Sequence, residues 1–222
     1  MENTEIDIEG IIELSEQVKL SAALRTFITV GYFKSYLLNI VDIHRIHRLR
    51  EAASFEEEIK LDWRIIHQAH TTILNKISIS KSEEDLIDFL SNRPFIEFLI
   101  LLGQRITPGS ITDFIALPPS KTKLKAALFK PYNKEIKLGV RAWEKHAGRT
   151  ELDFWGDVHG TPSYKEQKVN EIVTYIFKNI AWWNVFEHYK HGAVYEIREP
   201  KGHGLRWKLN ELAFIGFVEP FE

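Results

Sequence analysis

Histidine, arginine, tryptophan and carboxylate side chains gather near the C-terminal end of the chain. They fall in four short motifs, KHAGR at 145–149, FWGDVHG at 154–160, YEIRE at 195–199 and GHGLRW at 202–207. Polar groups set between glycines and beside tryptophan can be held at fixed angles against apolar walls, which is how ligand sites are usually lined. We therefore expect any binding or chemistry to lie in this stretch.

The loop motif contains a carboxylate two residues from an imidazole, Asp157 and His159. A carboxylate that orients a histidine is a common arrangement for a general base. We take this pair as the catalytic candidate if the chain is an enzyme, which the sequence alone does not decide. The alternative is a loop that satisfies its own backbone, with Asp157 in an Asx turn.

Two arginines, Arg198 and Arg206, fall on one face of predicted antiparallel strands together with Glu196 and Lys208. The planar fork of arginine suits a carboxylate or phosphate, so these residues favour a small anionic ligand such as a nucleotide or sugar phosphate. Gly202 and Gly204 would let that ligand approach the backbone. A ladder of opposite charges that only stabilises the sheet explains the pattern equally well. The predicted ligand-binding residues are His146, Arg149, Trp155, Arg198, His203, Arg206 and Trp207.

Two other classes of function remain open. A basic stripe on a helix predicted over 134–145, formed by Lys134, Lys137, Arg141 and Lys145, would suit a nucleic-acid-binding module, although we favour the small ligand. Alternatively, long helices predicted over 20–50 and 55–78 would present a surface to a protein partner or to a second copy of the chain, giving a homo-oligomer.

Metal and cofactor chemistry find little support in the sequence. The chain has no cysteine, which excludes thiolate nucleophiles, disulfides and cysteine-held metal. Three histidine pairs lie three residues apart, but carboxylates cannot be placed facing them, so we predict neither a metal site nor a cofactor. The pairs are His44 with His47, His67 with His70, and His188 with His191.

Composition points to a soluble, cytoplasmic protein without a membrane partner. The net charge of −2 over 222 residues argues against coating nucleic acid by bulk electrostatics. The acidic N-terminus lacks the basic segment and apolar core of a secretory signal. Charged residues interrupt the most apolar stretch, residues 20–49, which a membrane-spanning helix would not allow.

The predicted fold class is mainly α, with a small antiparallel β-meander at the C-terminus. Apolar residues recur at helical spacing over 20–49, and Ser82 with Asp85 forms a capping pattern for a later helix. Another long helix should run from Ser163 to about Gly192. Three short strands are expected near 195–197, 205–209 and 213–218, where the period changes to two.

Domain organisation is less clearly marked. Prolines and lysines between 118 and 133 interrupt the helical period and would suit a linker between a helical half, 1–117, and an α+β half, 134–222. We favour a single compact unit over 1–222, because the helical front would expose too much apolar surface by itself.

The last third of the chain resembles the C-terminal part of a group of uncharacterised proteins. The shared order is KHA-R, WG, GYGARW and F-GF-EP, carried here by KHAGR, FWG, GHGLRW and FIGFVEP. His203 stands where those proteins have an aromatic residue. The resemblance implies a shared fold for this segment and no known activity.

Overall fold

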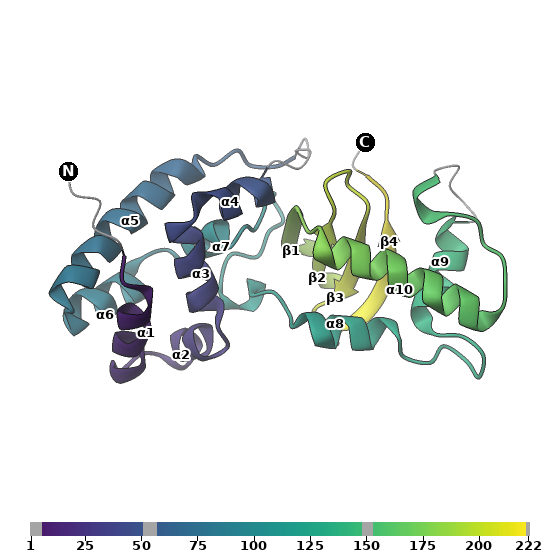
Figure 1. Cartoon of the computed structure of the whole chain (residues 1–222), viewed down its shortest axis with the longest axis horizontal. Coiled ribbons are helices and arrows are strands. Elements are labelled where there is room, and N and C mark those ends of the chain that lie inside the picture. Colours follow the sequence, from purple (N-terminus) through teal and green to yellow (C-terminus); the bar gives the residue numbers. More distant parts are fainter. Residues whose placement is uncertain (1–5, 51–56, 148–152, 221–222) are drawn as a thin grey trace. The chain divides into compact units, whose positions relative to one another are not determined.

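The computed structural model describes residues 6–50, 57–147 and 153–220. The predicted fold class is confirmed, because helices fill the N-terminal half and a four-stranded antiparallel sheet lies at the C-terminus (Figure 1). Two compact units divide the chain. The first comprises 1–48, 59–104 and 112–117, and the second comprises 49–58, 105–111 and 118–222. Cooperative folding of the two as a single domain stays a prediction.

The first unit is built from short helices and a 3-10 turn. In chain order they are α1 (Ile8–Gln17), α2 (Ala22–Thr29), α3 (Tyr32–Val41), α4 (Ile43–Arg50), α5 (Trp63–Ser80), α6 (Glu83–Asn92), α7 (Phe95–Leu101) and η1 (Phe114–Ala116).

The single helix expected over 20–49 is wrong, because α2, α3 and α4 replace it. Gly31 separates α2 from α3. Its φ of 90° is a left-handed conformation that glycine adopts without strain. Asp42 separates α3 from α4, because its backbone dihedrals are not helical. The capping pattern at Ser82 is confirmed, since its Oγ accepts a hydrogen bond from the backbone N of Asp85.

Aromatic rings form the centre of this unit. Phe27, Phe33, Tyr36 and Phe98 are fully buried, and their edge-on and stacked contacts join α2, α3 and α7. His70 of α5 lies in the same cluster, 5.2 Å from Phe98 between ring centres. A core of this kind follows from the helical spacing of large apolar residues.

The second unit joins helices to the sheet. Its elements are α8 (Lys121–Leu128), α9 (Leu138–Ala147), η2 (Asp153–Trp155), α10 (Pro162–Lys178), β1 (Trp182–His188), β2 (Gly192–Arg198), β3 (Gly204–Lys208) and β4 (Ala213–Val218). The strands are antiparallel neighbours in chain order, β1-β2-β3-β4. The segment expected as a linker, 118–133, contains α8.

Strand β1 replaces the end of the long helix expected to reach Gly192, so that expectation is wrong. Helix α10 ends at Lys178, and all seven residues of β1 then pair with β2, from Trp182 opposite Arg198 to His188 opposite Gly192. The sequence WWNVFEH has the aromatic and β-branched residues that favour strands.

One face of the sheet packs against the helices. Val185, Ile197, Leu205 and Trp207 are fully buried there, and Trp207 Nε1 donates to the carbonyl of Leu124 in α8. Figure 1 shows α10 crossing the sheet with α8 beside it. We call this the helix-covered face.

Gly204 serves the packing of the sheet, where the sequence suggested close approach of a ligand. A Cβ atom at Gly204 would lie 2.1 Å from the carbonyl oxygen of Ile197, a distance that no side chain permits. Glycine therefore lets β3 approach β2 at this point. Within the described residues, no helix is long and apolar enough to cross a membrane.

Candidate functional site

The other side of the sheet carries a band of polar and aromatic residues, which we call the polar face. Strand alternation places its members opposite the helix-covered face, and the register pairs them across the strands. The polar face consists of Trp182, Asn184, Phe186 and His188 of β1, Glu196 and Arg198 of β2, and Arg206 and Lys208 of β3.

A buried carboxylate organises this face. Glu196 is 1% exposed, and its Oε1 accepts a hydrogen bond of 2.6 Å from Arg198 Nε. Its Oε2 accepts a second from Arg206 Nε. Burial lowers the pKa of Arg198, while Glu196 opposes that change. One carboxylate thus faces two guanidinium groups, and Arg206 is the more exposed of the two.

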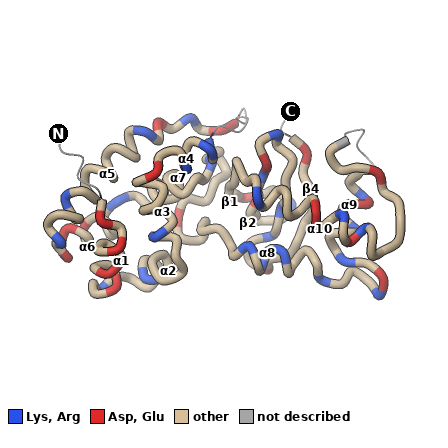
Figure 2. The backbone as a smooth tube through the Cα atoms, viewed as in Figure 1, with Lys and Arg blue, Asp and Glu red and all other residues tan. Residues whose placement is uncertain are grey.

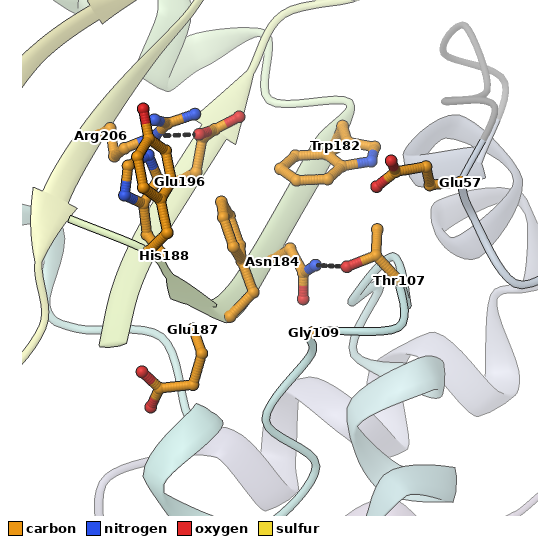
Figure 3. A pocket seen from close by; sticks show the side chains of 11 residues that line it. Glu57, Thr107, Gly109, Trp182, Asn184, Glu187, His188, Glu196 and Arg206 are labelled. Atoms are coloured by element: carbon orange, nitrogen blue, oxygen red, sulfur yellow. Dashed lines mark hydrogen bonds and ion pairs between the residues drawn. The ribbon is translucent and has the colours of Figure 1, made fainter. Parts of the chain in front are cut away.

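A pocket of about 480 Å³ opens on the polar face (Figure 3). This volume lies within the range of sites that hold one small ligand or part of a larger one. The residues that line it are Glu57, Thr107, Gly109, Trp182, Asn184, Phe186, Glu187, His188, Tyr189, Glu196 and Arg206.

Residues 105–111 form one rim of this pocket by extending the sheet beyond β1. The backbone N of Arg105 donates to Trp183 O, and the backbone N of Ile111 donates to Val185 O. Buried Asn184 then fixes the rim, because its side-chain amide donates to Ser110 Oγ at 2.8 Å. The bidentate ion pair of Arg105 with Glu58 anchors the same rim from the other side.

His188 is the imidazole that borders the pocket. Lys190 donates its backbone N–H to His188 Nδ1 at 3.1 Å, which requires a lone pair on that nitrogen. Burial lowers the pKa of His188, and the positive charge of Arg206 lowers it further. The ring is therefore neutral near pH 7 and beside a cationic group.

A second cluster collects three of the predicted ligand-binding residues around Glu219. His146 Nε2 lies 2.7 Å from Glu219 Oε1, and Trp155 Nε1 donates to the same oxygen at 2.8 Å. His203 Nδ1 lies 3.1 Å from Glu199 Oε1, and its ring stacks on Phe154 at 3.8 Å. We call these residues the Glu219 cluster. Sequence reasoning missed Glu219, although it lies in the shared FVEP motif.

The remaining predicted site residues are spread out. Asp157 and His159 are both exposed, and the His159 ring lies 5.4 Å from Tyr164. Trp207 lies in the core of the helix-covered face, and Arg149 lies outside the described residues. Arg198 and Arg206 do converge, on Glu196. The functional roles of all these residues stay predictions.

The basic stripe is only partly helical. Helix α9 begins at Leu138, so Lys134 and Lys137 precede it in a turn that Asn133 stabilises by accepting from two backbone N–H groups. The predicted start of the helix at 134 is therefore wrong. Lysines also recur along α8 (Figure 2).

The histidine pairs take up three different environments. The rings of His44 and His47 lie 6.5 Å apart on α4, and His70 is buried in the first unit. His188 and His191 lie at the turn of a β-hairpin instead of on a helix. Among the described residues, no group of three or more His, Asp or Glu is placed to hold a metal ion.

The second unit is thus an α+β domain with a pocket on the polar face of its sheet, lined by Arg206, His188 and three glutamates. Residues 126–219 match a family model, the CdiA C-terminal tRNase toxin domain. The matched segment runs from within α8 to just past β4 and contains the motifs of the resemblance described above, except the final proline of FIGFVEP. Curated proteins and solved structures gave no match to the chain.

This match corrects two expectations. The likeness to proteins of no known activity now has a named family, and that family is described as a tRNase. The expected small anionic ligand is therefore wrong, and the nucleic-acid alternative is better supported. The sequence does not distinguish the two kinds of ligand, because a pair of arginines fits a free phosphate and the phosphodiester of a nucleic acid equally well.

Proposed function

We propose that the second unit is a toxin domain that cleaves tRNA. The match of residues 126–219 to the CdiA C-terminal tRNase toxin domain carries this proposal. The polar face supports it, because an RNA-cleaving site needs a cation for the phosphate and a group that moves a proton. Arg206 and His188 place these two groups on one pocket.

Cleavage by the RNA's own 2′-hydroxyl suits these groups. In that reaction the 2′-oxygen attacks phosphorus, the O2′–P bond forms, and the P–O5′ bond breaks. The proton of the 2′-hydroxyl leaves and the 5′-oxygen gains one, so the ends are a 2′,3′-cyclic phosphate and a 5′-hydroxyl. We assign the phosphate contact to Arg206 and proton transfer to His188, with Glu196 holding Arg206 in position.

The direct test is incubation of the purified chain with intact end-labelled tRNA, followed by a denaturing gel and analysis of the new ends. We expect discrete fragments with 2′,3′-cyclic phosphate ends, and a loss of at least about 100-fold in rate for His188→Ala. The matched control is His191→Ala, from the same hairpin turn. Intact tRNA, with or without added divalent metal, would overturn the proposal.

The same assay locates the site. His188→Ala and His146→Ala remove one imidazole each, from the polar face and from the Glu219 cluster. Loss of cleavage in the first variant alone supports the polar face. Loss in the second alone, with folding intact, would move the reaction to the Glu219 cluster.

A further inference from the structure

The turn between β1 and β2 carries the sequence HYKH, residues 188–191, which the metal hypothesis left unexplained. Its tyrosine, Tyr189, is 86% exposed. A single exposed aromatic ring is ordinary on a protein surface. The residues around Tyr189 suggest a more specific role for this ring.

Tyr189 belongs to an aromatic rim of the pocket. Its ring stacks on His188 with centres 4.8 Å apart and an angle of 22° between planes. Both rings line the pocket together with Phe186, over which the guanidinium of Arg206 lies at 5.7 Å. Figure 3 shows His188 and Arg206 on the same side of the pocket. An exposed ring therefore lines the same pocket as Arg206, the cation to which we assign the phosphate contact.

Two basic residues lie on this side of the pocket. Lys190 Nζ lies 5.1 Å from the centre of the Tyr189 ring, and Arg206 lines the same pocket as Tyr189. Proteins that bind single-stranded nucleic acid combine these two elements, a cationic track for the backbone and aromatic rings on which bases stack. A base inside a duplex is already stacked and has to be extruded before it can use such a ring.

We propose that the pocket is a subsite for one unpaired nucleobase, which stacks on Tyr189 while its phosphate contacts Arg206. This inference rests on the proposed function and narrows its substrate to an unpaired stretch of RNA, such as a loop or a single-stranded end. Phe186 and Gly109 also line the subsite, and the carbonyl of Gly109 accepts a hydrogen bond from the backbone N of Glu187.

The test uses a short single-stranded oligoribonucleotide with 2′-O-methyl groups, which lacks the attacking hydroxyl and cannot be cleaved by that route. Its binding to the whole chain is measured by fluorescence anisotropy, beside a duplex of the same sequence. We expect Tyr189→Ala to weaken single-strand binding by about 5- to 100-fold and Tyr189→Phe to stay within about twofold, because stacking needs the ring and not the hydroxyl. The control is Tyr175→Ala, another exposed tyrosine on α10.

A second variant narrows the pocket without touching an aromatic ring. A Cβ at Gly109 would meet only the carbonyl oxygen of Glu187, at an ordinary 3.6 Å, so a side chain can begin there without a clash, and Gly109→Leu is used to fill part of the pocket. We expect it to weaken single-strand binding by at least about fivefold, as Tyr189→Ala does.

The outcomes separate the two proposals. Equal losses for single strand and duplex in Tyr189→Ala, or unchanged binding in both variants, would overturn the subsite. The subsite also falls if the wild-type chain does not bind the single strand. A chain that binds the single strand through Tyr189 but leaves tRNA intact would keep the subsite and sink the proposed cleavage.

Discussion

Glu196 and Arg206 lie directly opposite each other on β2 and β3, and Glu196 Oε2 accepts a hydrogen bond from Arg206 Nε. Because the other oxygen of Glu196 accepts from Arg198, the carboxylate holds both arginines on one side of the sheet. Arg206 also lines the pocket, and its guanidinium lies over the Phe186 ring at 5.7 Å. The hydrogen bond to Glu196 therefore fixes the position of the Arg206 guanidinium.

Arg206→Ala should lower the rate of tRNA cleavage by about 100- to 1000-fold, the usual effect of removing one preorganised donor to a reacting phosphate or oxyanion. Lys208→Ala is the matched control, since Lys208 follows on the same face of β3 and pairs with Glu211. Steady-state rates on labelled tRNA check both variants. Equal rates for Arg206→Ala and wild type would remove Arg206 from the site.

Glu196→Gln should destabilise the second unit by about 3–5 kcal/mol, because it leaves buried Arg198 and its neighbour without their counter-charge. Urea unfolding followed by tryptophan fluorescence measures the effect. Glu211→Gln, at an exposed pair with Lys208, should change stability by less than about 1 kcal/mol. Similar midpoints for the two variants would contradict the organising role of Glu196.

His146→Ala should act on stability while cleavage continues. The His146 ring lies edge-on to Trp155 at 4.9 Å, and its Nε2 contacts Glu219. Removing these interactions should cost about 1–3 kcal/mol and lower Tm. Thermal unfolding together with the cleavage rate at a temperature where the variant is folded provides the check. A fully folded variant without activity would show that His146 takes part in the reaction.

Acid should weaken the first unit through His70. Its Nδ1 is hydrogen-bonded to Tyr36 Oη and its Nε2 to Glu97 Oε2, both at 2.7 Å. Burial lowers the pKa of His70 and outweighs the opposing effect of Glu97, so the folded ring is neutral. The stability that depends on this neutral ring is present above the unfolded value near 6.5 and is lost as pH falls through the folded pKa.

Thermal unfolding between pH 5 and pH 8 tests this expectation. The fall in Tm below about pH 6.5 should be shallower in His70→Gln than in wild type, although its Tm at pH 8 will be lower. His44→Gln removes an exposed histidine from the same unit and should keep the wild-type pH dependence. Parallel curves for wild type and His70→Gln would refute the assignment.

The basic stripe gives a salt-dependent prediction. Replacing Lys134, Arg141 and Lys145 by alanine should weaken tRNA binding and reduce the slope of log K against log salt by about 0.7–0.9 for each phosphate that the protein no longer neutralises. All three side chains are exposed. Binding titrations of His188→Ala, the variant that we expect to be inactive, at several salt concentrations measure the slope. An unchanged slope would show that the stripe does not bind the substrate.

The helical character of the N-terminal half and the alternating strands β2 to β4 could be predicted because local signals decide them, although the breaks at Gly31 and Asp42 are not foreseen. Ser82 caps a helix through its own side chain, and Glu196 and Arg206 share a face because side chains alternate along strands. Strand β1 could not be predicted, because apolar residues at the spacing of α10 continue in the sequence past Lys178. What decides that boundary is pairing with β2, a contact between distant residues that no local pattern contains.

The candidate site shows the same division. Strand alternation correctly predicts that Arg198 and Arg206 lie on the same face of the sheet. Asp157 and His159 are paired only because they lie two residues apart in the sequence. Asn184 and the rim at 105–111 escape prediction, because Ser110 and Asn184 meet over a separation of 74 residues. The sequence indicates Glu196 as part of a ladder, and only burial shows that it organises the arginines.

The rim at 105–111 also determines where the chain can be cut. The family match begins at residue 126, yet Arg105 and Ile111 occupy the backbone groups along the outer side of β1. A fragment that starts at Pro118 would leave the carbonyls of Trp183 and Val185 unpaired at an open strand edge. Such an edge is a template for strands of other molecules, so this fragment would aggregate while one that retains residues 105–117 would not.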